Sequence, residues 1–338
     1  MVDKVGMRKW LFSFIINLFL IAVPELQAKE IVIIGINDVH AHMERVAAFA
    51  SRLKAEREKT PELVLVGAGD IFAGREVMDY DNTPEAMVEL MNLLEMDAAT
   101  FGNHEFDYGD EELFDYVKAA RFPFVCANCT PLGGETDVIH PYTIIERDGV
   151  KIGIIGLVET SDNGKPYIYS GYNPELVRFS SPFESMSNFA YLRTQCDILV
   201  ALSHLGYEAD CRLAHLFPEL DAIIGAHSHI VLPDDHMKNG VLIAQSGFAL
   251  THYSRLEFTV EDGVVKAKRG HSLCVGDSVE DQTVARYVES CRASAIKLSF
   301  RKMRKKMIKC SLSLSCVVVS LLMAVADFIV CRMGRTGT

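Results

Sequence analysis

In this 338-residue chain, five apolar segments each end in side chains that are able to bind metal ions. The side chains that follow these segments are Asp38 and His40, Asp70, Asn103 and His104, His204, and His227 and His229. Open α/β folds gather their ligands at the carboxyl ends of the strands. The pattern therefore predicts a sheet-based fold in which five strands end at one shared site.

Continuous apolar runs recur along the chain and predict strands that are covered on both faces. These runs are 31–36, 63–66, 122–125, 151–158, 197–202, 221–224 and 241–244. Helical patterns lie between some of them, at 44–59 and 84–95. Later, a Glu-Asp-Gly sequence between runs 252–260 and 264–271 predicts a β-hairpin. Strands that alternate with helices predict an α/β layered fold.

The length, composition and net charge of the chain limit the number of domains and the classes of binding partner that we expect. Apolar residues make up 49% of the chain, which is enough for a sizeable core. We expect one main domain over residues 29–275, followed by a C-terminal helix or linker over residues 276–300. The formal net charge of −11 argues against a nucleic-acid polymer as partner, because phosphate-backbone binding relies on basic patches. Any phosphate group that the chain binds is expected to be held locally, by metal ions.

Both ends of the chain contain a basic segment followed by an apolar one, outside the expected main domain. Residues 1–28 combine basic residues, an apolar run too short to span a bilayer, and a small residue at Ala28. This layout predicts a signal peptide, and hence export to the periplasm or the extracellular space. Residues 301–338 join a basic run to an apolar stretch. That tail is typical either of a membrane anchor or of a second, signal-like sequence joined to the chain by a reading-frame artefact.

The first two motifs supply oxygen and nitrogen donors. Asp38 and His40 are two residues apart at a predicted strand end, so their side chains point to the same side of the chain and are able to bind one ion. Asp70 follows Gly67-Ala68-Gly69, whose small side chains allow a sharp turn that brings a carboxylate close to a ligand. A carboxylate at this position is able to bridge two cations. The alternative for Asp70 is a helix N-cap.

The third motif is the run Asn103-His104-Glu105-Phe106-Asp107. The amide oxygen of Asn103 is a neutral ligand, and the adjacent His104 is able to face the substrate, with Asp107 placed to orient its ring. His104 would then stabilise the transition state or protonate the leaving oxygen. Glu105 is expected to be a surface or supporting group. The alternative is a capped helix start with a structural histidine.

Three further histidines complete the set of donors. His204 follows the apolar run 198–202, and His227 and His229 follow the run 222–224. Each of them alone would more often be structural than a ligand. Together with the other motifs they form a mixed set of nitrogen and oxygen donors, which suits zinc, manganese or iron. We therefore predict a metal site.

The motif order DxH, GD, GNHE, SH and GxHxH resembles the calcineurin-like metallophosphoesterase superfamily, and the spellings NHEFDYG and GAHSH resemble its 5′-nucleotidase branch. The resemblance implies a four-layer α/β/β/α sandwich with two mixed sheets, and two divalent metal ions. One ion would be held by Asp38, His40, Asp70 and His229. The other would be held by Asp70, Asn103, His204 and His227. The catalytic pair would be His104 and Asp107.

The resemblance also implies a reaction, the hydrolysis of phosphate esters by a metal-bridged hydroxide, with nucleotide 5′-monophosphates as the first expected substrates. In 5′-nucleotidases a C-terminal domain clamps the nucleoside. We expect this chain to be too short to contain that domain, so a separate chain is a candidate partner. Alternatives are a 2′,3′-cyclic-nucleotide phosphodiesterase, a nucleotide-sugar hydrolase, a thiosulfohydrolase-like sulfur-ester hydrolase and a non-catalytic nucleotide-binding subunit. A membrane-tethered interaction protein, with tail 301–338 in contact with the membrane, is another.

Overall fold

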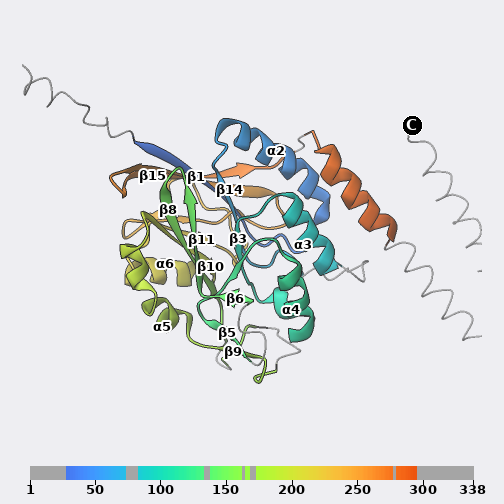
Figure 1. Ribbon diagram of the computed structural model, residues 1–338, viewed down its shortest axis with the longest axis horizontal. Helices are drawn as coiled ribbons and strands as arrows, with labels where there is room; N and C mark the ends of the chain where they lie inside the picture. Colours follow the sequence, from blue (N-terminus) through green and yellow to red (C-terminus); the bar gives the residue numbers. More distant parts are fainter. Residues whose placement is uncertain are drawn as a thin grey trace, which may run out of the picture. The chain divides into compact units, whose positions relative to one another are not determined.

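Two mixed β-sheets form the centre of the fold (Figure 1). The structure is a computed structural model, and it describes residues 28–73, 83–132, 138–161, 164–167, 173–276 and 279–294. The predicted signal peptide, except for Ala28, and the predicted tail 301–338 lie outside the described residues. Within those residues, none of the helices has the length and apolar character needed to cross a membrane.

The first sheet combines a parallel part with an antiparallel edge. Its strands, in spatial order, are β15 (Val264–Cys274), β14 (His252–Glu261), β1 (Lys29–Ile36), β2 (Val64–Ala68), β3 (Ala98–Thr100), β4 (Phe124–Val125) and β6 (Ile139–His140). Strands β1 to β6 in this order pair in parallel, whereas β14 and β15 pair antiparallel to their neighbours. The predicted hairpin is the pair β14 and β15.

The second sheet is parallel at its centre and antiparallel at both edges. Its strands, in spatial order, are β12 (Met237–Lys238), β13 (Val241–Ala244), β11 (Ala222–Gly225), β10 (Ile198–His204), β8 (Val150–Val158) and β7 (Tyr142–Arg147). The inner strands β13, β11, β10 and β8 are parallel, and β12 and β7 are antiparallel. A small separate sheet pairs β5 (Cys129–Pro131) with β9 (Val177–Phe179).

The main apolar core lies between the two large sheets. It contains buried side chains of both, among them Ile31 and Ile33 of β1, Val66 of β2, Ile154 of β8, Val200 of β10, Ile224 of β11 and Phe258 of β14. The continuous apolar runs of the sequence are explained by this position, because a central strand is covered by the other sheet on one face and by helices on the other.

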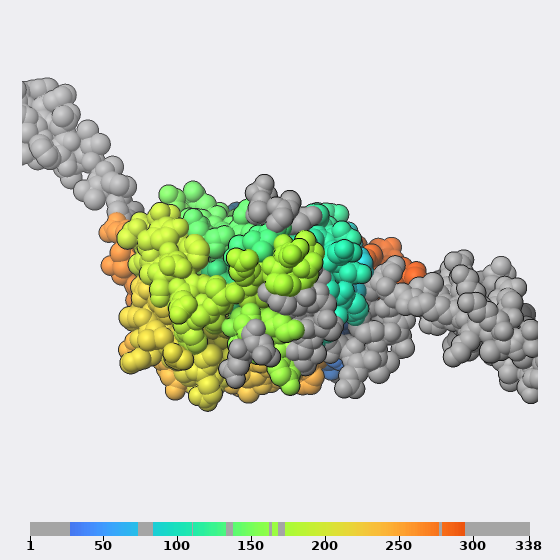
Figure 2. Space-filling model, turned by 90° about the horizontal axis from the view of Figure 1, so that it is seen from below, coloured from blue at the N-terminus to red at the C-terminus, as the bar shows by residue number. Residues whose placement is uncertain are grey.

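Helices cover the outer faces of the sheets (Figure 1). Those next to the first sheet are α2 (Val46–Lys59), α3 (Thr83–Leu93) and α4 (Asp110–Ala119), and those next to the second are α5 (Pro182–Ser187) and α6 (Tyr207–Leu216). An ion pair of 3.0 Å between Arg255 Nε and Glu56 Oε2 joins β14 to α2, and Leu213 of α6 packs with Ile223 of β11. Green-to-yellow segments, the colours of α5 and α6, form most of the face in Figure 2.

The predicted fold class, a layered α/β fold with two mixed sheets, is confirmed. The longer apolar runs correspond to strands, whereas β7 was not predicted. Its residues alternate between half-buried and exposed positions because it lies at a sheet edge. The C-terminal segment predicted as a helix or linker is helical over residues 282–294. The proposed domain limits remain a prediction.

Candidate metal centre

The predicted ligand residues lie at the carboxyl ends of strands from both sheets. In the first sheet, the loop after β1 contains Asp38 and His40, the loop after β2 contains Asp70, and the loop after β3 contains Asn103. In the second sheet, β10 ends at His204 and the loop after β11 contains His227 and His229. Parallel strands end at the same edge of their sheet, and here the corresponding edges of the two sheets meet. Sequence segments nearly 200 residues apart thus contribute to one site.

Left-handed backbone conformations orient most of these side chains. The positive φ angles are 48° at Asp38, 49° at His40, 51° at Asp70, 72° at His227 and 54° at His229. Non-glycine residues seldom adopt such angles, and they persist only where the surroundings impose them. The predicted convergence of Asp38 and His40 is present, but its predicted cause is wrong. Strand β1 ends at Ile36, so left-handed turns rather than strand alternation orient the two side chains.

Two glycines allow the loops to approach each other closely. Gly69 has a φ of 88°, and a Cβ atom there would lie 2.5 Å from the backbone nitrogen of Gly102. A Cβ atom on Gly102 would lie 2.1 Å from Asp70 Oδ1. Neither distance is tolerated by real side chains, so any larger residue would displace the loop that contains Asp70. The small residues predicted to permit a turn before Asp70 are therefore also a packing requirement.

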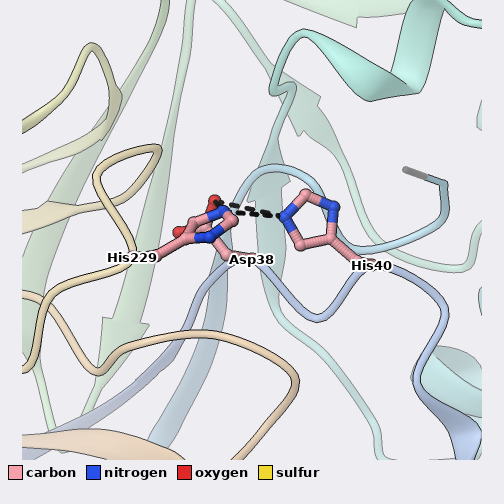
Figure 3. Close-up of side chains that lie close together, drawn as sticks. All are labelled: Asp38, His40 and His229. Atoms are coloured by element: carbon pink, nitrogen blue, oxygen red, sulfur yellow. Dashed lines mark hydrogen bonds and ion pairs between the residues drawn. The ribbon is translucent and has the colours of Figure 1, made fainter. Parts of the chain in front are cut away.

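Asp38, His40 and His229 form the first donor group (Figure 3). His40 Nε2 lies 2.9 Å from His229 Nε2, and His229 Nε2 lies 3.3 Å from Asp38 Oδ1. His40 Nδ1 is 3.2 Å from the carbonyl oxygen of Ala73, a contact that places the ring proton on Nδ1 and leaves Nε2 as an electron-pair donor. Two imidazole nitrogens and a carboxylate that face one another are suited to a shared cation.

Asp70, His204 and His227 form the second donor group, whose ligand atoms all lie within 4.8 Å of one another. His204 Nδ1 is 2.9 Å from the carbonyl oxygen of Ala68, which directs Nε2 toward Asp70 Oδ2 at 3.2 Å. Nε2 of His204 is buried and has no hydrogen-bond partner among the described residues. Asn103 Oδ1 lies 3.1 Å from His227 Nδ1, next to this group. A buried imidazole nitrogen that makes no hydrogen bond is expected of a histidine that binds a metal ion.

Asp70 lies between the two groups. Its Oδ2 atom is 3.2 Å from His204 Nε2 of the second group and 3.8 Å from His40 Nε2 of the first. Its other oxygen, Oδ1, accepts a hydrogen bond of 2.9 Å from the backbone N–H of His104. The carboxylate is almost fully buried and held in a single orientation. Asp70 is therefore placed to contact ions in both groups.

The charges in the site also favour cations. Burial opposes ionisation of Asp70, but the neighbouring His204 and His40 outweigh burial and lower the pKa of the carboxyl group. Burial likewise opposes protonation of His204, but Asp70 outweighs it and raises the pKa of the imidazole to about 10. The carboxylates thus require positive charge close by. Divalent cations supply that charge when they replace the histidine proton, so the residues present fit the predicted metals.

His104 and Asp107 form a pair at the edge of the donor groups. Asp107 Oδ2 lies 2.7 Å from His104 Nδ1, and this hydrogen bond, against the opposing effect of burial, raises the pKa of His104. His104 is partly exposed, and its ring centroid lies 5.3 Å from that of His40. One ligand atom of His104 also lies within 4.8 Å of ligand atoms of Asp70 and His40, so the pair is adjacent to both metal groups.

Glu105 has a structural role that the sequence did not define. It is fully buried, and its carboxylate accepts backbone N–H bonds from Asp70 at 2.7 Å and Gly102 at 2.6 Å, and also from Ile71 and Phe72. Burial, and then the charge of Asp70, raise the pKa of Glu105 to about 7. Of the two expected positions, surface or supporting, the structure shows the supporting one. No pattern in the sequence marks which distant N–H groups an acidic residue binds.

Asn37 is a second supporting residue, and the sequence analysis missed it. Its Nδ2 atom donates to Asp38 Oδ2 at 2.7 Å and to the carbonyl oxygen of Gly247 at 2.8 Å. Its Oδ1 atom accepts a bond of 3.0 Å from the backbone N–H of Ser246. Asn37 therefore joins the Asp38 loop to the loop after β13. The sequence contains one indication of this role, which is the position of Asn37 directly after an apolar run and next to Asp38.

Comparisons with known proteins agree with this geometry. The sequence model of the family described as Calcineurin-like phosphoesterase matches residues 31–231. The chain is 27% identical over 287 residues to the trifunctional nucleotide phosphoesterase protein YfkN of Bacillus subtilis (strain 168), an alignment covering 72% of this chain and 19% of that relative. It is 30% identical over 226 residues to the snake venom 5′-nucleotidase of Naja atra, covering 60% of this chain and 42% of that relative.

A solved structure shows the same similarity. The 5′-nucleotidase precursor from Thermus thermophilus superposes with a TM-score of 0.67 at 26% sequence identity, and the match covers 80% of this chain and 60% of that chain. This chain spans about half or less of the length of the curated relatives described above. The family match nevertheless extends over more than half of this chain and includes every predicted metal ligand and the pair His104 and Asp107. This chain therefore belongs to the calcineurin-like phosphoesterase family.

Proposed function

We propose that this chain is a dinuclear metallophosphatase that hydrolyses nucleotides, with nucleotide 5′-monophosphates as its first substrates. The observation that supports the proposal most strongly is the position of Asp70. One of its oxygens lies between His204 of one donor group and His40 of the other. The names of the relatives, which include 5′-nucleotidases, support the nucleotide class of substrate.

The proposed ligand assignment uses the two donor groups as they lie. One cation would be held by Asp38, His40, Asp70 and His229. The other would be held by Asp70, Asn103, His204 and His227. Zinc, manganese and iron all suit this mixture of nitrogen and oxygen donors. When bound, two such cations would activate a water molecule and neutralise charge on the phosphoryl group.

The remaining residues have roles that follow from their contacts. His104, whose protonated form is favoured by its hydrogen bond to Asp107, would donate to the phosphoryl group or protonate the leaving oxygen. Glu105 holds the backbone on both sides of the site through its bonds to Asp70 and Gly102. Asp38 is oriented by the backbone N–H of His227, which lies 3.0 Å from Oδ2. The chain therefore positions the donors before substrate binds.

Export and a partner chain are further parts of the proposal. The signal-like layout of residues 1–28 supports export to the periplasm or the extracellular space. The tail 301–338 supports contact with a membrane, since it joins a basic run to an apolar one. A separate chain that would supply additional nucleotide contacts is the third part.

The test is hydrolysis of four substrates by the full chain with manganese or zinc added. Released phosphate measures the hydrolysis of AMP and of a generic aryl phosphate, and chromatography of the products measures that of UDP-glucose and 2′,3′-cyclic AMP. We expect AMP to be hydrolysed at the highest kcat/KM, and hydrolysis of all four to be lost in the variant Asp70→Asn. Release from the aryl phosphate alone would retain the phosphatase and reject the nucleotide preference. An Asp70→Asn variant with unchanged turnover would reject the dinuclear site.

A further inference from the structure

An exposed aromatic side chain adjoins the metal centre without supplying a donor atom to it. The ring of Phe248 stacks on the ring of His229, with centroids 5.2 Å apart and planes inclined by only 12°. Phe248 is 47% exposed, although it is a large apolar residue. One face of its ring covers a proposed metal ligand, and about half of the residue is open to solvent.

The loop that contains Phe248 is fixed on both sides of the residue. Before it, the carbonyl oxygen of Gly247 accepts a bond of 2.8 Å from Asn37 Nδ2. After it, the backbone N–H of Ala249 donates to the carbonyl oxygen of Asp38 at 2.7 Å. Ala249 and Leu250 have consecutive positive φ angles of 53° and 54°. Such strain persists where other contacts impose it, so the position of the Phe248 ring relative to Asp38 is defined by the backbone.

Phe248 also continues a series of ring contacts that begins at His104. The centroid distances are 5.3 Å from His104 to His40, 4.9 Å from His40 to His229, and 5.2 Å from His229 to Phe248. Val231, which forms a bridge with Ser246 in the same loop, is 47% exposed as well. The series thus leads from the histidines of the donor groups to an exposed apolar surface.

A single exposed phenylalanine is ordinary on a protein surface. This one differs because its backbone is fixed and its ring lies parallel to a proposed ligand. A rigid aromatic face binds planar groups by stacking, and the contribution from one base is about 1–3 kcal/mol. A phosphate ester bound at the donor groups would place its leaving group at the rim, within reach of this face.

We propose that Phe248 determines specificity by stacking on a planar ring within the leaving group of the phosphate ester, either the base of a nucleoside or the ring of an aryl alcohol. The inference rests on the proposed function, because it assumes that an ester is bound by the two donor groups. It extends that function by assigning leaving-group recognition to a residue of the metal-binding chain itself. Esters with a planar ring are therefore favoured over esters of open-chain or saturated alcohols.

The first experiment compares two substrates of the full chain with manganese added. AMP has a planar base, and glycerol phosphate has none. The variants are Phe248→Ala, Phe248→Tyr, which keeps the ring, and Tyr191→Ala as a matched control. Tyr191 is also 47% exposed, but it belongs to the 3-10 helix η3 (Ala190–Thr194) before the amino end of β10, whereas the metal centre lies at the carboxyl end.

Stacking predicts a change confined to the planar substrate. In Phe248→Ala, KM for AMP rises about 5- to 140-fold, as expected for the loss of one stacking contact, while kcat/KM for glycerol phosphate stays within about twofold. Phe248→Tyr and Tyr191→Ala retain the wild-type values. An equal loss on both substrates would overturn the proposal, since Phe248 would then only orient His229. Unchanged kinetics on both substrates would overturn it as well.

A second measurement does not depend on turnover. Saturation-transfer NMR with adenosine detects contact of the base with the protein. We expect a signal from the purine protons with the wild-type chain, and a severalfold weaker one with Phe248→Ala. An equal signal from both would reject the stacking role. If the wild-type chain released no phosphate from any ester, the proposed function would fail, while this comparison would still decide whether Phe248 binds a base.

Discussion

His104 and Asp107 are joined by a short hydrogen bond next to the two donor groups. The distance of 2.7 Å between His104 Nδ1 and Asp107 Oδ2 holds the ring in one orientation and favours its protonated form. Proposed metal ligands need the opposite state, a neutral imidazole with an available electron pair. In the proposed site, histidine would therefore serve two functions, and its hydrogen-bond partner would decide which.

A pH-rate profile tests this pair. The hydrogen bond to Asp107 raises the pKa of His104, so the acid remains protonated to higher pH, and activity falls only when the pH exceeds that value. In Asp107→Asn the raising effect is lost, and the descending limb of kcat/KM should move to lower pH. His104→Asn should lower kcat by about 10²- to 10⁴-fold with metal content unchanged. A descending limb at the same pH in Asp107→Asn and in the wild type would contradict the effect of Asp107 on the pKa of His104.

Glu105 provides a second test at the scale of single residues. Its carboxylate accepts N–H bonds from Asp70 and Gly102, so Glu105→Gln would direct an NH₂ group at backbone donors. Leaving such groups unsatisfied in the interior is expected to lower the free energy of unfolding by about 1–3 kcal/mol. Urea unfolding measures the change. The control is Glu111→Gln, at an exposed position in α4, which should unfold as the wild type does. Equal stability of both variants would show that Glu105 does not stabilise the loops that contain Asp70 and Gly102.

At the scale of elements, the site depends on how closely the loops after β2 and β3 approach each other. Gly102→Ala would place a Cβ atom 2.1 Å from Asp70 Oδ1 and should reduce metal affinity at least about tenfold, as expected when a neighbour of the ligands is disturbed. Gly270→Ala, in β15, is the control, because its Cβ atom would meet only the flexible end of Leu242, at 3.1 Å. Titration with zinc measures both. Equal affinities would refute the packing argument.

The strand ends could be predicted from the sequence because polar ligands directly follow apolar runs. His204, for example, follows the run that forms β10. The left-handed turn at Asp38 could not be predicted, because Ala249 and His227, from distant loops, bind its backbone or side chain and impose it. Edge strands such as β7 were missed because alternating exposure gives no continuous apolar run. The stacking of Phe248 on His229 also depends on a tertiary contact, so no local pattern marks it.

At the scale of the whole molecule, the candidate metal centre joins the two sheets. Asp38 and Asp70 follow strands of the first sheet, and His204 and His227 come from the second. Bound cations should therefore stabilise the entire fold and not only the loops. A ligand present at 100 times its Kd adds about 2.7 kcal/mol per site.

Thermal unfolding measures this contribution. We expect Tm to fall by several degrees when EDTA removes the metals, and to recover when manganese or zinc is returned. In Asp70→Asn the addition of metal should produce little or no rise in Tm, because both donor groups lose their shared carboxylate. A rise as large as that of the wild type would show that Asp70 does not contact the ions.

Asp70 is proposed to join two cations in one hydrolytic site. The decisive measurement is the metal content per chain, obtained by elemental analysis together with phosphate release from AMP. A shared carboxylate predicts two metal ions per wild-type chain at full activity, and loss of both metal and activity in Asp70→Asn. Full activity with a single ion per chain, or two ions and normal turnover in Asp70→Asn, would contradict it.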